Sequence, residues 1–275
     1  MSGRDPLVPA RPLGGSDAMP GPSTVAHVWC RALADGAAAP GSVPAADDVE
    51  WALSHAERVR RERLRRAQDR VLFTAAWGLV RHALSEVEPR VAPDEWHFLR
   101  AGLGRPEVQH PSWARSLRFN LSHTEGVVAC VVTRDARCGV DVERMGRPLA
   151  LHRLTRSVLS EGEQREFDLA PPGRRQELFY RYWTLKEAYL KAIGTGMRFP
   201  MTACEFEVGT RSPSLRSLAA GPGHLQYAFR QWPVRGSGFL ALAVQAGGVH
   251  ARAPDVTVRV HATGIGDDRS CPALF

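Results

Sequence analysis

The hydrophobic pattern of this chain alternates between helical and extended periods, and this alternation limits the possible folds more than any other feature. Residues 47–86 have a helical pattern with an interruption expected near His55, and four apolar residues from Leu72 to Ala83 recur at a spacing that predicts one core-facing side. Residues 96–143 contain short apolar or alternating runs between turn residues, as antiparallel strands do. Helical patterns return between 149 and 193, and strand-like runs follow up to 244. This order predicts an α+β protein.

The two groups of elements divide the chain into two lobes of comparable content. We expect a flexible leader over 1–24, an N-terminal α+β lobe over 25–136, a C-terminal α+β lobe over 137–263 and a loose tail over 264–275. Each lobe is expected to hold a small, mostly antiparallel sheet packed on helices, so that the lobes form a pseudo-two-fold pair. Because no internal sequence repeat accompanies this pairing, it rests on the order of the elements alone.

The composition is ordinary for a soluble protein, with 44% hydrophobic and 24% charged residues. No run of about 18 apolar residues occurs, and the start of the chain lacks the apolar stretch of a secretory signal. The five cysteines are an odd number without a CxxC pair, which argues against a disulfide framework and against a zinc knuckle. We therefore expect a cytoplasmic protein.

The charge balance is basic. The chain carries 36 Lys and Arg against 29 Asp and Glu, a formal net charge of +7. A basic surface favours an acidic partner, which includes nucleic acid, an anionic membrane, a polyphosphate ligand and an acidic protein. Charge alone does not choose among these four.

The segment 139–143, Gly-Val-Asp-Val-Glu, is the most informative polar pattern in the chain. As a strand it places Val140 and Val142 on one face, and Asp141 and Glu143 on the other. The two carboxylates then stand about 7 Å apart at their Cα atoms, which lets their oxygens converge on one hard cation. Mg²⁺ prefers a few carboxylates together with phosphate oxygens and waters, so the pattern suits a site that handles phosphate. A half-exposed edge strand would give the same alternation.

A second pattern lies on the helix predicted over 176–193. Trp183, Glu187 and Lys191 recur at i, i+4 and i+8 along one stripe. Lys186 lies about 100° to the side of Glu187. A third carboxylate flanked by two lysines could share a metal while the lysines hold phosphate oxygens. The simpler alternative is a surface Glu–Lys pair worth about a few tenths of a kcal/mol.

Three shorter patterns are less specific. Ser122 and His123 end a predicted strand and enter a turn, where they can donate to phosphate or simply tie the turn together. The tripeptide 104–106, Gly-Arg-Pro, is by itself an ordinary turn. Ser160 and Glu163 fit a capping box at the start of a helix.

The order of these motifs resembles a known family. The chain carries, in sequence, G-R-P, F-N-L-S-H, G-V-D-V-E and W-T-L-K-E-A-Y-L-K-A-I-G-T-G. This series resembles the 4′-phosphopantetheinyl transferase superfamily, and specifically its two-lobed Sfp type, which activates polyketide and non-ribosomal peptide synthases of secondary metabolism. The resemblance covers roughly Leu53 to Glu207. Its most specific part is the D-x-E motif followed by W-x-x-K-E-x-x-x-K.

The resemblance implies an enzyme that uses Mg²⁺ to move the 4′-phosphopantetheine arm of coenzyme A onto a serine of an apo acyl or peptidyl carrier protein. Adenosine 3′,5′-bisphosphate would leave. Carrier proteins are typically acidic, which suits a basic enzyme. Because the two lobes would complete the site between them, we expect a monomer. The resemblance also implies a protein that binds neither nucleic acid nor membrane.

The roles of the family's metal ligands are assigned here to the matching positions of this chain. By resemblance, Asp141, Glu143 and Glu187 would be the acidic ligands of Mg²⁺. Together with Lys191 they would form the catalytic set. The proton of the carrier serine needs an acceptor, and the sequence leaves both Glu187 and a water on the metal open.

Roles at coenzyme A also carry over by resemblance. Arg105 stands where the family usually has a lysine at the 3′-phosphate, and an arginine keeps the charge. Lys186 and Lys191 would contact the phosphates or the pantetheine arm. Ser122 and His123 match residues that grip the nucleotide phosphates.

One position departs from the family pattern. The family has an arginine nine residues before the arginine that aligns with Arg81, and Leu72 occupies that position here. Arg70 is nearby but about 200° around the helix. Arg70 is therefore expected as a phosphate contact only if the register is shifted.

The main alternative is a Mg²⁺-dependent nuclease, because spaced acidic residues followed by E-x-x-x-K also suit phosphodiester cleavage. A non-catalytic nucleic-acid binder built on the arginines of 58–66 is a second alternative. It leaves the carboxylates unexplained, since acidic groups repel phosphate unless a metal intervenes.

Overall fold

The computed structural model of the chain describes residues 24–33, 50–101, 105–146, 151–209, 212–218, 226–234, 238–246 and 256–263. The predicted leader, apart from Thr24, and the predicted tail lie outside these residues, as does Gly104 of the G-R-P motif.

The first half of the chain forms one α+β lobe. Its strands are β1 (Thr24–Ala32), β2 (His97–Ala101), β3 (Arg105–His110), β4 (Leu117–Thr124) and β5 (Val127–Arg134). Its helices are α2 (His55–Glu62) and α3 (Ala67–Val87), with single 3-10 turns at Glu50–Ala52, Pro93–Glu95 and Ser112–Ala114. The helical stretch predicted over 47–86 is thus interrupted, and the turn expected at Arg105 is the start of a strand.

The second half repeats this mixture of elements. Its strands are β6 (Cys138–Arg144), β7 (Cys204–Glu207), β8 (Ser214–Leu218), β9 (Tyr227–Val234), β10 (Gly238–Gln245) and β11 (Val256–Thr263). Its α-helices are α4 (Leu151–Val158), α5 (Glu161–Leu169) and α6 (Pro172–Ile193), and 3-10 turns occupy Gly196–Arg198 and Met201–Ala203. None of the described helices combines the length and the apolar character that crossing a membrane requires.

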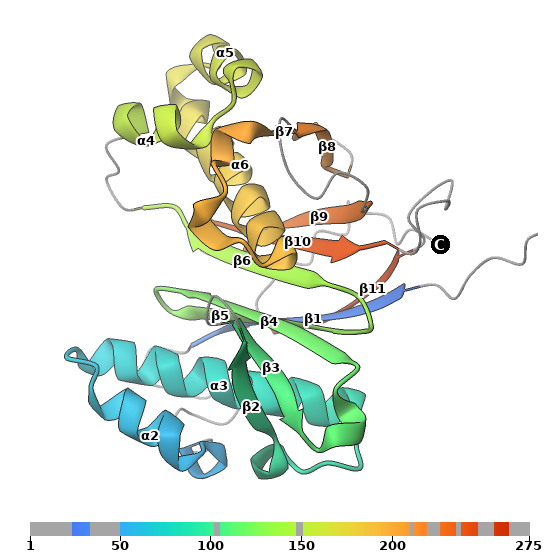
Figure 1. Cartoon of the computed structure of the whole chain (residues 1–275). Coiled ribbons are helices and arrows are strands. Elements are labelled where there is room, and N and C mark those ends of the chain that lie inside the picture. Colours follow the sequence, from blue (N-terminus) through green and yellow to red (C-terminus); the bar gives the residue numbers. More distant parts are fainter. Residues whose placement is uncertain are drawn as a thin grey trace, which may run out of the picture.

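Two larger sheets form the centre of the molecule. Their strand orders are β11-β1-β5-β4 and β6-β10-β9, and every pairing except the parallel β1–β11 pair is antiparallel. Figure 1 shows the two sheets between α2 and α3 on one outer side and α4, α5 and α6 on the other. The α+β class and the paired lobes therefore agree with the prediction, since each lobe has a small sheet with helices on its outer face.

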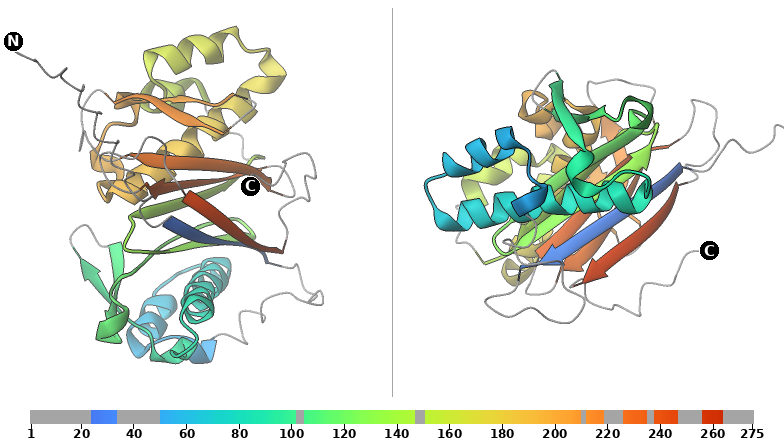
Figure 2. Two further views of the ribbon diagram at one scale, coloured as in Figure 1. Left: turned by 90° about the vertical axis from the view of Figure 1, so that its right-hand side faces the viewer. Right: turned by 90° about the horizontal axis from the view of Figure 1, so that it is seen from below.

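Strand β11 crosses the predicted boundary between the lobes. The sequence division placed residues 137–263 in the second lobe, but Val256–Thr263 pairs with β1 at the edge of the first lobe's sheet. Figure 2 shows β11 beside β1 in both views. The chain thus returns to the first lobe at its end. A parallel partner far away in sequence leaves no local pattern, which explains the error.

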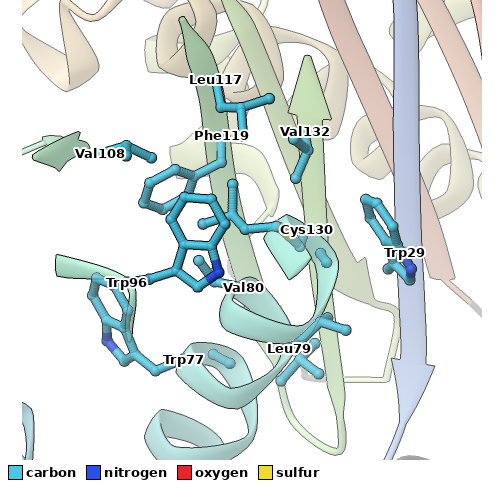
Figure 3. Packing of buried hydrophobic residues seen from close by; sticks show 14 of the residues in the cluster. Trp29, Trp77, Leu79, Val80, Trp96, Val108, Leu117, Phe119, Cys130 and Val132 are labelled. Carbon is cyan, nitrogen blue, oxygen red and sulfur yellow. The ribbon is translucent and has the colours of Figure 1, made fainter. Parts of the chain in front are cut away.

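Strand β5 is apolar on both faces because its sheet is covered on both sides. Along β5, Val127, Ala129 and Val131 face the other sheet, whereas Cys130 and Val132 face α3. Figure 3 shows the face of the sheet that packs against α3, where three tryptophans belong to the core. These side chains are Trp29, Trp77 and Trp96, each at most 7% exposed. Each such burial stabilises the fold by about 1.5–3 kcal/mol or more.

Helix α3 presents the predicted stripe to this core, since Leu72, Ala76, Leu79 and Ala83 are all buried. The sequence did not predict that Arg81 would be buried among them. Its Nη1 donates to the carbonyls of Pro93 (2.9 Å) and Trp96 (2.8 Å), and its Nη2 bonds a Glu57 carboxylate oxygen at 2.8 Å. A buried guanidinium is tolerated here because acceptors and a countercharge surround it.

Helix α6 ends as predicted and begins earlier than predicted. Gly194 closes it in the left-handed conformation at φ 79°, where glycine is the favoured residue. The prolines that stop α5 also begin α6, because a proline without an amide hydrogen fits the first helical position. The capping box of Ser160 and Glu163 at the start of α5 is confirmed.

Gly139 permits close contact between α6 and β6. A Cβ atom at this position would lie 2.0 Å from the carbonyl oxygen of Ala188 and 2.6 Å from the amide nitrogen of Ala192. Both distances are shorter than any van der Waals contact, and both partners are backbone atoms that cannot rotate away. Glycine at 139, together with small residues on α6, therefore sets the distance between helix and strand.

We predict that Gly139→Ala destabilises the protein by about 3 kcal/mol, at the upper end of overpacking effects, because helix and strand must separate. Urea unfolding of the two chains measures the difference. Gly173→Ala is the matched control, since nothing lies within 4 Å of a Cβ at that helical position, and it should be neutral or slightly stabilising. Equal stability of both variants would contradict this account.

The contact between β1 and β11 includes a histidine pair. The Nδ1 of His27 lies 3.1 Å from the Nε2 of His261, and both rings stack on Trp29. A Glu86 oxygen accepts from the Trp29 indole at 3.0 Å and lies 3.7 Å from His261. Burial, then the charges of His261 and Arg259, lower the pKa of His27 below 6.5, although Glu86 opposes the shift. The folded chain therefore binds this proton less readily than the unfolded chain.

We predict that this pair contributes stability above about pH 6.5 that is lost as the pH falls through the lowered pKa of His27. The fall in Tm between pH 7.5 and pH 5.5 should be smaller for His27→Gln than for the wild-type chain, because glutamine cannot take up the proton. Thermal unfolding followed by circular dichroism at the two values provides the comparison. An identical pH dependence in both chains would exclude the pair as its source.

Candidate active site

Strand β6 places its two carboxylates on the face that α6 covers. Val140 and Val142 are fully buried between the sheets, so Asp141 and Glu143 point to the opposite side, as the alternation predicted. Asp141 is only 4% exposed, whereas Glu143 is half-buried. Helix α6 runs across this face (Figure 1). A carboxylate this deeply buried requires partners, and the neighbouring elements provide them.

Two other predicted site residues, Lys191 on α6 and Ser122 on β4, contact Asp141 on β6. The Lys191 ammonium on α6 lies 2.6 Å from Asp141 Oδ1, and the Ser122 hydroxyl on β4 donates to the same oxygen at 2.9 Å. Lys191 also donates to Ser122 Oγ at 3.0 Å and to the Val140 carbonyl at 3.2 Å. The tertiary structure therefore brings together β4 and α6, which are about 70 residues apart, around one carboxylate oxygen.

The other oxygen of this carboxylate, Asp141 Oδ2, is buried and has no hydrogen-bond partner in the described part of the chain. A buried acceptor without a partner costs about 1–3 kcal/mol, and more when it is charged. Such an orphaned oxygen is the kind of atom that a bound cation would satisfy. It is the most direct indication of a cation site on this face of β6.

The negative charge of Asp141 raises the pKa of both Glu143 and Glu187. Burial, and next the negative charge of Asp141, raise the pKa of Glu143 to about 7. A hydrogen bond from Thr124 lowers the same pKa and so opposes the shift. The same two causes raise the pKa of Glu187, and Lys191 opposes them. The repulsion among these acids would be relieved by a divalent cation. As the side chains stand, however, no three His, Cys, Asp or Glu side chains of the described ranges are arranged to hold a metal ion.

A cavity of about 750 Å³ opens between the lobes beside Glu143. We call it the interlobe cavity, and it lies between the start of α3, the ends of β4 and β6, and the middle of α6. Its charged lining comes from Arg66 and Arg144 and from Asp69, Glu125 and Glu143, and Trp183 contributes an aromatic wall. Burial, then the charge of Lys191, lower the pKa of His123, which also lines the cavity, and this favours the neutral ring there. The aromatic wall suits a flat ring, and because three carboxylates face two arginines, an anionic ligand would need a bound cation beside Glu143.

Lys186 does not reach this cavity, which corrects the expectation that it contacts the phosphates of coenzyme A. Its side chain is fully buried, and its ammonium donates to the carbonyls of Val158, Met201 and Cys204 at 2.7–2.9 Å. A Glu163 oxygen lies 2.6 Å from the same nitrogen. Burial lowers the pKa of Lys186, and Glu163 opposes that shift. Neighbouring positions on a helix face different ways, so Lys186 faces the core while Glu187 faces the site.

Two arginines are also occupied elsewhere. The Nη atoms of Arg105 donate to backbone carbonyls and not toward the interlobe cavity, so the expected contact with the 3′-phosphate is not supported. Arg70 donates to the carbonyls of Leu64 (2.8 Å) and Arg65 (3.4 Å), which holds the turn between α2 and α3. In both cases the main chain provides acceptors that no sequence motif predicts.

Arg66 and Arg144 are the cations that line the interlobe cavity in their place. In the sequence, Arg66 is one of the arginines of the stretch 58–66, and no motif assigns a role to Arg144. Three arginines of that stretch are occupied locally, since Arg58 bonds the Leu53 carbonyl, Arg61 pairs with Glu50 and Arg60 lies over Phe73. The position of Arg144, directly after the D-x-E motif, is the signal that could have identified it.

We predict that Lys186→Met destabilises the protein by about 3–5 kcal/mol, because it leaves the buried Glu163 carboxylate without its countercharge. The double variant Lys186→Met/Glu163→Gln should recover part of the loss, since it removes the unpaired charge. Chemical denaturation measures both. If the single variant keeps wild-type stability but binds coenzyme A more weakly, Lys186 belongs to the ligand site after all.

Comparison with known proteins points to one family. The sequence profile described as the 4′-phosphopantetheinyl transferase superfamily matches residues 137–244, from the start of β6 to the end of β10. The 4′-phosphopantetheinyl transferase HetI of Nostoc sp. is 32% identical over 54% of this chain and 63% of its own length. The chain thus spans slightly less than two thirds of that relative.

Two further relatives align over more of their own length. The phosphopantetheinyl transferase of Thraustochytrium sp. is 29% identical over 77% of this chain and 76% of its own length. The 4′-phosphopantetheinyl transferase pptA of Paxillus involutus is 30% identical over 61% of this chain and 68% of its own length.

Proposed function

The chain belongs to the 4′-phosphopantetheinyl transferase superfamily, and on that premise we propose that it transfers the 4′-phosphopantetheine arm of coenzyme A to a serine of an apo acyl or peptidyl carrier protein. The observation that carries this proposal is the junction of Asp141, Ser122 and Lys191 beside two further carboxylates, at the edge of a cavity between two lobes. We place the reaction in the cytoplasm.

The reaction is a phosphoryl-type substitution. The carrier serine Oγ forms a bond to the β-phosphorus of coenzyme A, and the bond from that phosphorus to the oxygen bridging to the α-phosphorus breaks. The electron pair leaves on that oxygen with adenosine 3′,5′-bisphosphate. The serine proton passes to a base, and we assign this role to Glu187, because it is the carboxylate that α6 contributes next to Asp141.

The carboxylates fit Mg²⁺. Asp141 has a buried oxygen without a partner, and the pKa values of Glu143 and Glu187 are raised partly by mutual repulsion. Asp141, Glu143 and Glu187 would hold the ion through oxygen ligands, which Mg²⁺ prefers. When bound, Mg²⁺ would supply positive charge to the pyrophosphate oxygens.

Lys191 supplies the second positive charge. Its ammonium is half-buried and already lies among Asp141, Ser122 and the Val140 carbonyl. A cation held in this way can stabilise the charge that develops on a leaving phosphate without reorganising during the reaction. Ser122 fixes the orientation of Asp141, so its role is to position the carboxylate.

Charge also suits the partner. The chain has a net charge of +7, and Arg63, Arg65 and Arg66 are exposed at the turn between α2 and α3 near the interlobe cavity. An acidic carrier protein would be steered toward such a surface. Since β4, β6 and α6 of one chain provide the junction, a monomer suffices.

The direct test is a mass measurement. The chain, coenzyme A, Mg²⁺ and an apo carrier protein are incubated, and the carrier should gain about 340 Da, the mass of one phosphopantetheine group. An excess of EDTA should abolish the gain. If the carrier mass is unchanged while added DNA is cleaved in the presence of Mg²⁺, the nuclease alternative replaces this proposal.

We predict that Asp141→Asn and Glu187→Gln each lower kcat by at least about 100-fold, because each removes charge from the cation site. Tm should stay within a few degrees, since neither change alters side-chain volume. Glu177→Gln is the matched control on the same helix: this residue pairs with the exposed Arg174 at 3.0 Å, and its loss should leave turnover unchanged. Full turnover of either site variant at normal Mg²⁺ would refute the assignment.

A further inference from the structure

We infer that Arg105 is a positioning residue, which docks the end of α6 onto the first lobe and thereby holds Lys191 at Asp141. The inference deepens the proposed function and rests on it for the reaction that is measured. It replaces the expected contact between Arg105 and the 3′-phosphate of coenzyme A.

The guanidinium of Arg105 bonds four carbonyls from three elements. Its Nη1 donates to Lys191 (2.9 Å) and Ala192 (3.3 Å) on α6. Its Nη2 donates to Cys138 on β6 (2.9 Å) and to Phe119 on β4 (3.4 Å). Arg105 itself begins β3 of the first lobe. One side chain therefore connects β3 and β4 of the first lobe with β6 and α6 of the second.

Two of these carbonyls need an external donor. The last four carbonyls of an α-helix have no partner within the helix, and a positive charge near them is stabilising. The amide of the closing residue, Gly194, satisfies the Leu190 carbonyl at 3.0 Å. Arg105 satisfies the next two, those of Lys191 and Ala192. It therefore acts as a C-terminal cap provided by the other lobe.

The same helical turn carries the site lysine. The carbonyl of Lys191 accepts from Arg105, while its ammonium contacts Asp141 and Ser122. Moving the last turn of α6 therefore moves the ammonium as well. Since a displacement of about 1 Å in a catalytic site can cost about 100-fold in rate, the clamp matters for turnover although Arg105 contacts no reacting atom.

The chemistry of arginine suits this position. Its planar fork directs one Nη nitrogen toward α6 and the other toward β4 and β6, so one rigid group bonds both lobes. Both Nη nitrogens already donate to main-chain carbonyls, so a phosphate would have to displace at least one of these bonds to reach the guanidinium.

The decisive experiment compares coenzyme A with 3′-dephospho-coenzyme A as substrates of the wild-type chain, Arg105→Ala and Arg105→Lys. A positioning role predicts that Arg105→Ala lowers kcat by about 10- to 100-fold for both substrates, with the preference for coenzyme A unchanged within about threefold. Arg105→Lys should fall between the two chains. Arg118→Ala, an exposed arginine on β4 paired with Glu107, is the matched control and should keep wild-type rates.

A second readout needs no turnover. Hydrogen exchange of the amides of residues 190–193 in the ligand-free chain should accelerate at least about tenfold in Arg105→Ala and not in Arg118→Ala, because the cap of α6 is lost. A phosphate contact predicts no such change without ligand.

The possible outcomes separate the two claims. If Arg105→Ala loses its preference for the 3′-phosphate while kcat and the exchange of α6 stay at wild-type values, the clamp is wrong and the phosphate contact is right. If the wild-type chain modifies no carrier protein, the proposed function fails, and the clamp is then decided by the exchange measurement alone.

Discussion

The close contact between α6 and β6 is the constraint on which the site depends. Because Gly139 has no side chain, the backbone of α6 lies against the strand, and the next residues of the strand, Asp141 and Glu143, come within reach of Glu187 and Lys191. A wider separation would leave Asp141 buried without its lysine partner. The distance between helix and strand therefore fixes both the packing of the second lobe and the electrostatics of the site.

Cations held by main-chain carbonyls form a second level of organisation. Arg81, Arg105 and Lys186 each donate to backbone carbonyls, and each connects elements that are distant in sequence. Burying a charge is costly, but several carbonyl acceptors, in two of the three cases with a carboxylate, offset the cost. The basic residues of the motifs thus divide between holding the scaffold and lining the site. Lys191 does both, because its carbonyl belongs to the clamp and its ammonium to the site.

Local patterns predicted the elements well where the pattern itself is local. The stripe on α3, the alternation of β6, the capping box at Ser160 and the glycine at 194 all follow from short-range geometry. Strands β3, β8 and β11 were missed. A proline-containing turn motif hides β3, and a distant parallel partner hides β11. The role of Lys186 was predicted wrongly for a related reason, because a motif records residue order and not which carbonyls lie nearby. For Arg105 the same hydrogen bonds to carbonyls leave the predicted phosphate contact without support.

The sequence by itself determined the α+β class, the family and the face of β6 that carries the carboxylates, because side-chain alternation and motif order are properties of the chain alone. Only the tertiary structure decided which charged groups remain available for a ligand. That outcome depends on burial and on hydrogen bonds to main-chain atoms contributed by other elements. Three-dimensional packing places the Lys186 ammonium and the Arg105 guanidinium on main-chain carbonyls, and it brings Lys191 to Asp141 on the face of β6 where we propose the site.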